Sequence, residues 1–159
     1  MSLIISVFNG VNLPFEEDYF DNVICRYAFH HFPCYDTTLE EIARTLKHKG
    51  IFILADAIRN EEDRVDFINR LQELKEDGHV RMYKSKELIQ LVSQHGFKLI
   101  DCFESFISFR RKRTADINEL LKLTPPKVRE SYSIVRTESE LSLTFKILNA
   151  IFENQRTLS

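Results

Sequence analysis

The sequence predicts an α/β fold built on parallel strands, and three observations support this. Two short apolar runs, Val23–Cys25 and Ile51–Ala55, have the length and continuity typical of strands buried in a parallel sheet. A segment with helical spacing joins them, which makes a right-handed βαβ crossover. Titratable side chains follow both runs, namely His30, His31 and Asp56. Because open α/β sheets bind ligands at the carboxyl ends of their strands, the pattern also predicts where a site would lie.

Length and composition narrow the class of protein. A chain of 159 residues is long enough for one domain with a real core, so we expect a single domain over residues 1–159. The net charge of −2 gives no basic field for nucleic acid, and the local run Arg110–Arg113 is expected to be a solvated turn. No apolar run is long enough to span a bilayer, so we expect no membrane partner.

Cysteine and glycine usage exclude several kinds of site. The three cysteines (Cys25, Cys34 and Cys102) are scattered and form no Cys-x-x-Cys motif, so neither a disulfide framework nor a zinc site is expected. We expect reduced thiols and a cytoplasmic protein. There are only four glycines, and no two are close enough for a phosphate-cradling loop.

The N-terminal part predicts two strands. Ile4–Phe8 is a β-branched run that ends at the turn signal Asn9-Gly10. After a loop rich in acidic residues, a second strand is expected near Asn22–Tyr27. Pro33 then prevents a smooth helical start directly after the histidines.

A helix and a strand follow. Thr37 and Glu40 fit a capping box at the start of the helix, and apolar residues repeat at helical spacing up to Leu46. Gly50 is expected to end this helical segment. Ile51–Ala55 is then the second parallel strand.

Two further helices and a strand are expected in the middle of the chain. Glu61–Glu76 is a charged segment with one apolar stripe, ended by Asp77-Gly78-His79. Ser85 can cap a second helix, which His95-Gly96 closes. Phe97–Phe103 follows as a strand.

The last third of the chain predicts a helical insertion over Thr114–Thr137 before a terminal strand. Ala115–Leu123 and Lys127–Val135 have short helical patterns, separated by a stop at Thr124–Pro126. Leu141–Ile147 alternates between apolar and polar residues, which predicts a strand. The spacing of apolar residues from Phe145 to Phe152 also fits a helix, so that alternative stays open.

Several short motifs occur in a characteristic order and spacing: Leu13-Pro-Phe15, Phe20-Asp21-x-Val-Ile-Cys25, His30-His-Phe32, Leu39-x-Glu-Ile-x-Arg-x-Leu46, Gly50-x-Phe-x-Leu-Ala-Asp56, Gly78-His-Val-Arg81 and Gly96-Phe97. In this order the sequence closely resembles the class I S-adenosylmethionine-dependent methyltransferases. The subgroup it resembles includes the ubiquinone/menaquinone-biosynthesis type and many enzymes that methylate small molecules.

The resemblance implies a seven-stranded sheet in the order 3-2-1-4-5-7-6, with the seventh strand antiparallel. The third, fourth, fifth, sixth and seventh strands would be Ile4–Phe8, Val23–Tyr27, Ile51–Ala55, Phe97–Phe103 and Leu141–Ile147. The expected fold is therefore a partial Rossmann-like sheet in the order 4-5-7-6 with flanking helices, without the first and second strands.

S-adenosylmethionine is the cofactor that the resemblance implies. The family's glycine motif follows its first strand and is not in this sequence. The resemblance therefore implies only about half of the residues of the cofactor site. Asn9 aligns with the acid that accepts a hydrogen bond from the adenine amino group, beside Gly10. Cys25, Arg26 and Tyr27 would line the methionine end of the cofactor. Cys25 has the alternative of a small buried apolar residue, and Arg26 needs either a carboxylate or solvent.

The acceptor side of the site would contain His30 and His31, because imidazole takes up a proton near neutral pH. The alternative is a polar loop pair that caps the next helix and packs on Phe32. Since neighbouring residues rarely face one site, we expect at most one of them to act. Asp56 is expected to form a turn with its own backbone.

Three other polar residues are expected to be structural. Asp21 would form an Asx-type turn into its strand. His79 and Arg81 would be surface loop residues, although the resemblance places them near the acceptor pocket. No metal site is expected.

Three hypotheses about function follow from the resemblance and from the absence of the glycine motif. The first is methyl transfer to a small-molecule acceptor, by an enzyme inactive as this chain alone because the glycine loop is absent. The alternative is a non-catalytic remnant that oligomerises or binds a partner. A third hypothesis is a regulatory subunit whose site is completed by the glycine loop of another protein.

In the family's sheet the first strand pairs with the fourth. Because no first strand is expected here, one edge of the Val23–Tyr27 strand is expected to be unpaired. Such an edge templates pairing with another strand. We therefore expect a homodimer through that edge, or Ile4–Phe8 folding across it, either in cis or swapped between chains.

Overall fold

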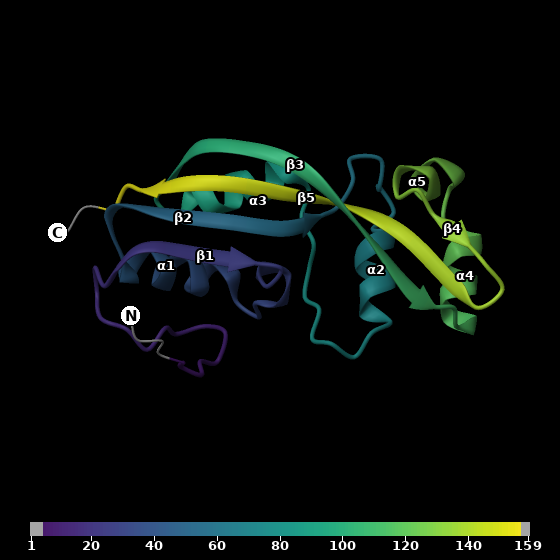
Figure 1. Ribbon diagram of the computed structural model, residues 1–159, viewed down its shortest axis with the longest axis horizontal. Helices are drawn as coiled ribbons and strands as arrows, with labels where there is room; N and C mark the ends of the chain where they lie inside the picture. Colours follow the sequence, from purple (N-terminus) through teal and green to yellow (C-terminus); the bar gives the residue numbers. More distant parts are fainter. Residues whose placement is uncertain (1–4, 157–159) are drawn as a thin grey trace.

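A parallel pair of strands joined by a helix forms the first half of the fold. The computed structural model describes residues 5–156. Strands β1 (Phe20–Arg26) and β2 (Leu46–Ile58) pair in parallel. Helix α1 (Tyr35–Thr45) makes the crossover between them. The predicted βαβ unit is confirmed (Figure 1).

The sheet has the order β1-β2-β5-β3, as Figure 1 shows. Strand β5 (Glu140–Asn154) runs antiparallel to both β2 and β3 (Phe97–Lys112). The short strand β4 (Val135–Arg136) pairs with β5. This is the predicted order 4-5-7-6 with the seventh strand antiparallel. Within residues 5–156, the outer edge of β1 has no strand partner.

Strands β3 and β5 are about twice as long as predicted, because their ladder extends from Phe97 opposite Asn154 to Lys112 opposite Glu140. The helical alternative for the end of the chain is wrong. Its spacing arises because β5 changes its buried face between the adjacent residues Ile147 and Leu148, which are both buried.

Two cores on opposite faces of the sheet explain this change. The first core packs α1 and α3 (Ser85–Gln94) against β5 residues from Leu148 onward. The second packs α2 (Phe67–Glu73) and α4 (Ala115–Leu123) against β5 residues up to Ile147. A strand that serves both cores must bury alternate residues on one side and then on the other.

Part of the sheet face that faces away from α1 and α3 remains open. Ile24, Ile53 and Ile151 are opposite one another across β1, β2 and β5. The Ile24 side chain is 67% exposed, and Phe103 on β3 is 62% exposed. None of these residues belongs to either buried cluster. The three isoleucines therefore form an apolar strip that crosses β1, β2 and β5 on this open face.

The predicted N-terminal strand is wrong over the residues that can be checked. Residues 5–8 have no strand conformation, and Ile5 and Val7 are exposed. Ile4 lies outside the described residues. A strand needs a sheet neighbour, and residues 5–8 form no ladder with β1. Pairing of residues 5–8 with β1 in cis is therefore not observed.

Several helix boundaries differ from the sequence pattern. Helix α1 begins at Tyr35 with Cys34 at the N-cap, so the Thr37–Glu40 capping box does not form. Gly50 lies within β2 instead of ending the helix, because the C-cap is Leu46.

Helix α2 covers only the second half of the predicted Glu61–Glu76 segment. Asp66 adopts a left-handed conformation (φ 58°), which delays the start of the helix. Helix α4 has the predicted bounds, whereas α5 (Pro126–Ser131) is shorter than Lys127–Val135. A 3-10 turn, η1 (Phe29–His31), follows β1.

The basic run is also not a solvated turn. Its first three residues belong to β3, and the Arg111 guanidinium donates a hydrogen bond to Leu71 O (2.9 Å). Arg113 donates to Asn118 Oδ1. Two of the four charges therefore tie the end of β3 to neighbouring helices. Among residues 5–156, none of the helices has both the length and the apolar character needed to cross a bilayer.

Candidate functional site

The two predicted histidines line a cavity at the carboxyl ends of β1 and β2. The chain leaves β1 through Tyr27, which has φ 50°, and enters the η1 turn that contains His30 and His31. The cavity has a volume of about 270 Å³. Its lining consists of aromatic, apolar and titratable side chains: Tyr27, His30, His31, Ala57, Gln72, Lys75, Asp77, His79, Met82, Phe109 and Phe145.

Asp56 holds His30 through both its backbone and its ring. His30 Nδ1 lies 2.5 Å from Asp56 Oδ1, and His30 N donates to Asp56 Oδ2 (3.1 Å). Asp56 is only 1% exposed and sits in β2. Since a carboxylate only accepts hydrogen bonds, His30 Nδ1 carries a proton, and in the neutral ring Nε2 is the nitrogen with the lone pair. The dyad is therefore arranged to accept a proton at Nε2.

The expectation that Asp56 only forms a turn is wrong. Its Oδ1 does accept a hydrogen bond from the neighbouring Ala57 N (2.7 Å), but β2 continues to Ile58. The sequence missed the pairing because His30 and Asp56 are 26 residues apart and meet only when β1 and β2 align.

Both histidines line the cavity, so the premise that neighbouring residues rarely face one site does not hold here. That at most one of them acts stays a prediction. The centroids of the His30 and His31 rings are 4.1 Å apart. A 3-10 turn, unlike a strand, does not send successive side chains to opposite sides. Neither histidine caps α1, whose N-cap residue is Cys34.

His79, expected to be a surface residue, belongs to the same cavity. Its ring centroid is 5.8 Å from that of His30. The following segment is tied to the histidine turn, because Val80 N and Arg81 N both donate to His30 O (2.9 and 3.1 Å). The Gly78-His79 motif in the sequence was the signal for this placement. Arg81 itself is exposed, as expected, and its guanidinium lies over the Tyr83 ring.

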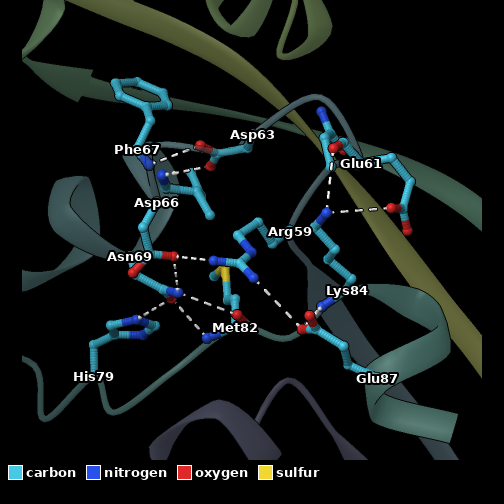
Figure 2. Close-up of polar contacts among 12 residues, drawn as sticks. Arg59, Glu61, Asp63, Asp66, Phe67, Asn69, His79, Met82, Lys84 and Glu87 are labelled. Atoms are coloured by element: carbon cyan, nitrogen blue, oxygen red, sulfur yellow. Dashed lines mark hydrogen bonds and ion pairs between the residues drawn. The ribbon is translucent and has the colours of Figure 1, made fainter. Parts of the chain in front are cut away.

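A polar network holds the His79 ring on its other side (Figure 2). His79 Nε2 lies 3.0 Å from Asn69 Oδ1, and Asn69 also bonds to both backbone groups of Met82. Burial, together with the neighbouring His30 and His31, lowers the pKa of His79 to about 4. The ring is therefore neutral at physiological pH.

The predicted cofactor residues lie on the other side of β1 or point elsewhere. Cys25 and Arg26 line a second, mostly apolar cavity of about 340 Å³ beside Phe8 and Leu13. Burial raises the pKa of the Cys25 thiol to about 12, so Cys25 is the small buried residue of the alternative interpretation. Tyr27 lines the histidine cavity instead, and the exposed Arg26 guanidinium stacks on its ring at 4.5 Å.

Asn9 and Gly10 are engaged within the N-terminal loop. Asn9 Oδ1 accepts hydrogen bonds from Val11 N (3.0 Å) and Asn12 N (2.9 Å). Gly10 has φ 78°, and its carbonyl accepts a hydrogen bond from the Thr38 hydroxyl. The polar atoms expected to contact an adenine are therefore already bonded to the chain.

Asp21 has a structural role of a different kind from the one expected. Its carboxylate pairs with Lys47 Nζ at 2.7 Å on the exposed surface of β1 and β2. Across residues 5–156, no group of three or more histidine, cysteine or acidic side chains is placed to hold a metal ion.

Comparisons with known proteins agree with this architecture. A model of the methyltransferase domain family matches residues 3–54. The uncharacterized methyltransferase YcgJ of Bacillus subtilis is 44% identical over 71 residues, which are 44% of this chain and 28% of YcgJ. The uncharacterized protein YafE of Escherichia coli is 33% identical over 84 residues, which are 52% of this chain and 41% of YafE. These matches span less than half the length of both curated relatives.

Solved structures share the fold. A protein of Bacillus halodurans, provisionally assigned as a methyltransferase, aligns with a TM-score of 0.81 at 24% identity, covering 94% of this chain and 70% of that one. The structure of YcgJ aligns with a TM-score of 0.75 at 25% identity, covering 93% of this chain and 69% of that one. The resemblance to the class I S-adenosylmethionine-dependent methyltransferases is confirmed, in sequence over residues 3–54 and in fold.

Proposed function

We propose that this chain, a relative of the class I S-adenosylmethionine-dependent methyltransferases by sequence and by fold, carries the acceptor side of a methyl-transfer site. The observation that supports this most directly is the contact of 2.5 Å between His30 Nδ1 and Asp56 Oδ1 beside the histidine cavity. The substrate class is a small molecule, which matches a cavity of about 270 Å³.

The dyad supplies the step that such an acceptor needs. An oxygen or nitrogen nucleophile has to lose a proton as it is methylated, and His30 Nε2 is free to accept it. Asp56 then stabilises the resulting imidazolium, because it is buried and already bonded to His30 Nδ1. The cavity wall positions the acceptor and keeps bulk water from the reacting group.

S-adenosylmethionine is the methyl donor of the family, but the residues assigned to it here do not complete a site. Asn9 Oδ1 is bonded inside the loop, the Gly10 carbonyl accepts a hydrogen bond from Thr38 of α1, and Cys25 is buried. The sequence also has no cluster of glycines for close backbone approach. We infer that the 159 residues do not bind the cofactor alone and act with a glycine-rich half, in a reducing cytoplasmic environment that suits three free cysteines.

Calorimetry with S-adenosylmethionine tests this division of the site. We expect no heat of binding for the 159-residue chain at millimolar cofactor. A chimera that places the N-terminal part of YcgJ before the matched region is expected to bind, because it adds the missing wall. Tight binding of S-adenosylmethionine by the 159-residue chain would contradict the inference that its cofactor site is incomplete. A chimera that folds, as shown by circular dichroism, but does not bind would contradict the proposed function.

The open edge of β1 favours a second function, self-association. Within the described part of the chain β1 pairs only with β2, and Ile24 is 67% exposed on the open face. A two-fold axis at Ile24 would pair β1 with its copy and extend the sheet. Opposed isoleucines would then meet at about 5 Å, the usual spacing of cross-strand pairs.

Light scattering after size-exclusion chromatography tests this association. We expect a dimer for the wild type and a monomer for Ile24→Lys, because two like charges would oppose each other across the axis. Val135→Lys is the matched control, since Val135 on β4 is 63% exposed and far from β1 in the sheet order. That variant should remain dimeric. A monomeric wild type, or a dimeric Ile24→Lys, would contradict the proposal.

A further inference from the structure

Asn69 determines which nitrogen of His79 carries the proton. Asn69 Oδ1 accepts a hydrogen bond from Met82 N (2.7 Å), and its Nδ2 donates to Met82 O (3.1 Å) and Asp66 Oδ1 (2.8 Å). These contacts leave the amide only one orientation. His79 Nε2, at 3.0 Å from Asn69 Oδ1, must therefore be the donor (Figure 2).

The other ring nitrogen of His79, Nδ1, then carries a buried lone pair that accepts no hydrogen bond. Nδ1 is shielded from solvent and has no hydrogen-bond partner among residues 5–156. Because the pKa of the ring is about 4, Nδ1 stays unprotonated at neutral pH and cannot become a donor instead. A buried acceptor without a partner is costly, and such atoms in native proteins usually have a functional reason.

His30 presents a second lone pair to the same cavity. Its Nδ1–H is held by Asp56, so Nε2 is the free acceptor. The His30 and His79 ring centroids are 5.8 Å apart. The two rings come from different segments, and the bonds of Val80 N and Arg81 N to His30 O keep these segments next to each other.

The remaining residues of the cavity disfavour an anionic ligand. Ala57, Met82, Phe109 and Phe145 provide apolar walls. Lys75 is the one lysine or arginine of the lining; it is 43% exposed, and its Nζ lies 3.8 Å from Asp77 Oδ2. An anionic ligand would meet two lone pairs and the buried Asp56 carboxylate, and the one cation near it already has a carboxylate neighbour.

We propose that the cavity binds an uncharged small molecule through two hydrogen bonds that the ligand donates, one to His30 Nε2 and one to His79 Nδ1. The ligand class is a ring or short chain with two neighbouring O–H or N–H groups. His79 is then a specificity-determining residue, which recognises the donor that is not methylated. This inference rests on the proposed function, since His30 is the proton acceptor in both.

Binding requires a small movement that exposes His79 Nδ1. The segment of residues 78–84 has neither helix nor strand, and it begins at Gly78 with φ 76°. Asn69 can remain in place during such a movement, because it belongs to α2 and its Nδ2 also donates to Asp66 Oδ1 (2.8 Å), outside that segment.

Nitrogen-15 NMR of the 159-residue chain tests the geometry without any cofactor. We expect His79 to be the Nε2–H tautomer at pH 7 and to titrate near pH 4, and His30 to be the Nδ1–H tautomer. The opposite tautomer at His79 would overturn the inference. Zinc should not shift the histidine signals, and a stoichiometric shift would also overturn it in favour of a metal site.

Three ring compounds in which methoxy groups successively replace the O–H donors test the ligand class: 1,2-dihydroxybenzene, 2-methoxyphenol and 1,2-dimethoxybenzene. Each lost donor is expected to weaken binding about fivefold, the effect of one net hydrogen bond. Equal binding of all three, or no binding of the dihydroxy compound, would overturn the inference. If the series holds but the chimera transfers no methyl group, the proposed function fails and the binding inference stands.

His79→Phe assigns the second hydrogen bond. The variant keeps a ring of similar size, and Asn69 Oδ1 still has Met82 N as its partner. The dihydroxy compound should then bind about fivefold more weakly, like 2-methoxyphenol in the wild type. His48→Phe, at an exposed histidine of β2, is the control and should leave the series unchanged. An unchanged affinity in His79→Phe, with a native circular dichroism spectrum, would contradict the role of His79.

Discussion

Replacing Asp63 by alanine is expected to lower the free energy of unfolding by about 4 kcal/mol, because it removes three hydrogen bonds to a charged acceptor that each contribute roughly 1.5 kcal/mol. Asp63 is fully buried. Its carboxylate accepts from Phe67 N (2.8 Å), Ile68 N (3.0 Å) and the Tyr132 hydroxyl (3.0 Å). It therefore joins the start of α2 to the end of α5. Figure 2 shows its contact with Phe67 at the start of α2.

The loss would not be replaced by water or by another side chain. The two amides belong to the first turn of α2 and have no partner inside the helix. The Tyr132 hydroxyl also accepts a hydrogen bond from Asn60 N (3.1 Å), so this part of the network would lose its anchor. α2 packs against α4 in the second core, and we expect that core to loosen.

Urea denaturation followed by circular dichroism measures the effect. Asp63→Asn should fall between the wild type and Asp63→Ala, because an amide oxygen still accepts but one of the two oxygens is lost. Asp101→Ala, at an exposed aspartate of β3, is the control and should change stability by less than about 0.5 kcal/mol. A cost below about 1 kcal/mol for Asp63→Ala would show that the network does not anchor α2.

Asp56→Asn is expected to reduce methyl transfer by about 10²–10⁴-fold in the chimera that contains the glycine-rich half. The amide can turn its NH₂ group toward His30 Nδ1, which would move the ring proton to Nε2. His30 would then no longer have a lone pair for the acceptor. With the NH₂ group at the Oδ1 position, the amide oxygen keeps the hydrogen bond from His30 N, and the bond from Ala57 N is lost. Since one of the two bonds from backbone amides remains, we expect the fold to remain.

Two measurements separate this role from a structural one. Transfer of a tritium-labelled methyl group to a panel of small O–H and N–H compounds gives the rate. Nitrogen-15 NMR of the 159-residue chain gives the His30 tautomer, which should change to Nε2–H. Asp101→Asn is the control, because Asp101 is an exposed aspartate of β3 that does not line the cavity. An unchanged tautomer with an unchanged rate would refute the dyad.

Local patterns predicted the sheet well because its strands are locally distinct. The apolar runs at β1 and β2 are continuous, and the helix between them leaves only the parallel arrangement. The sheet order came from the family resemblance, which depends on motifs spread from Leu13 to Phe97. By contrast, the run at residues 5–8 has strand composition but forms no strand, although the outer edge of β1 has no strand partner within residues 5–156, so composition alone does not determine pairing.

The candidate site was predicted only in part, for a related reason. His30 and His31 stand out because they directly follow a buried strand. Their partners do not stand out, since Asp56 and His79 lie 26 and 49 positions further along the chain from His30. Each looked like an ordinary turn or surface residue, because nothing near it in the sequence shows that it will be buried.

The sequence by itself determined the βαβ unit, the absence of a glycine-rich loop and the place of two histidines at the end of a strand. These follow from short-range properties, namely side-chain periodicity, turn residues and chain order. The tertiary structure alone decided that His30 meets Asp56, that Asn69 orients His79, and that β5 changes its buried face between Ile147 and Leu148. Each depends on which segments pack together, and burial then determines which polar atoms must find a partner.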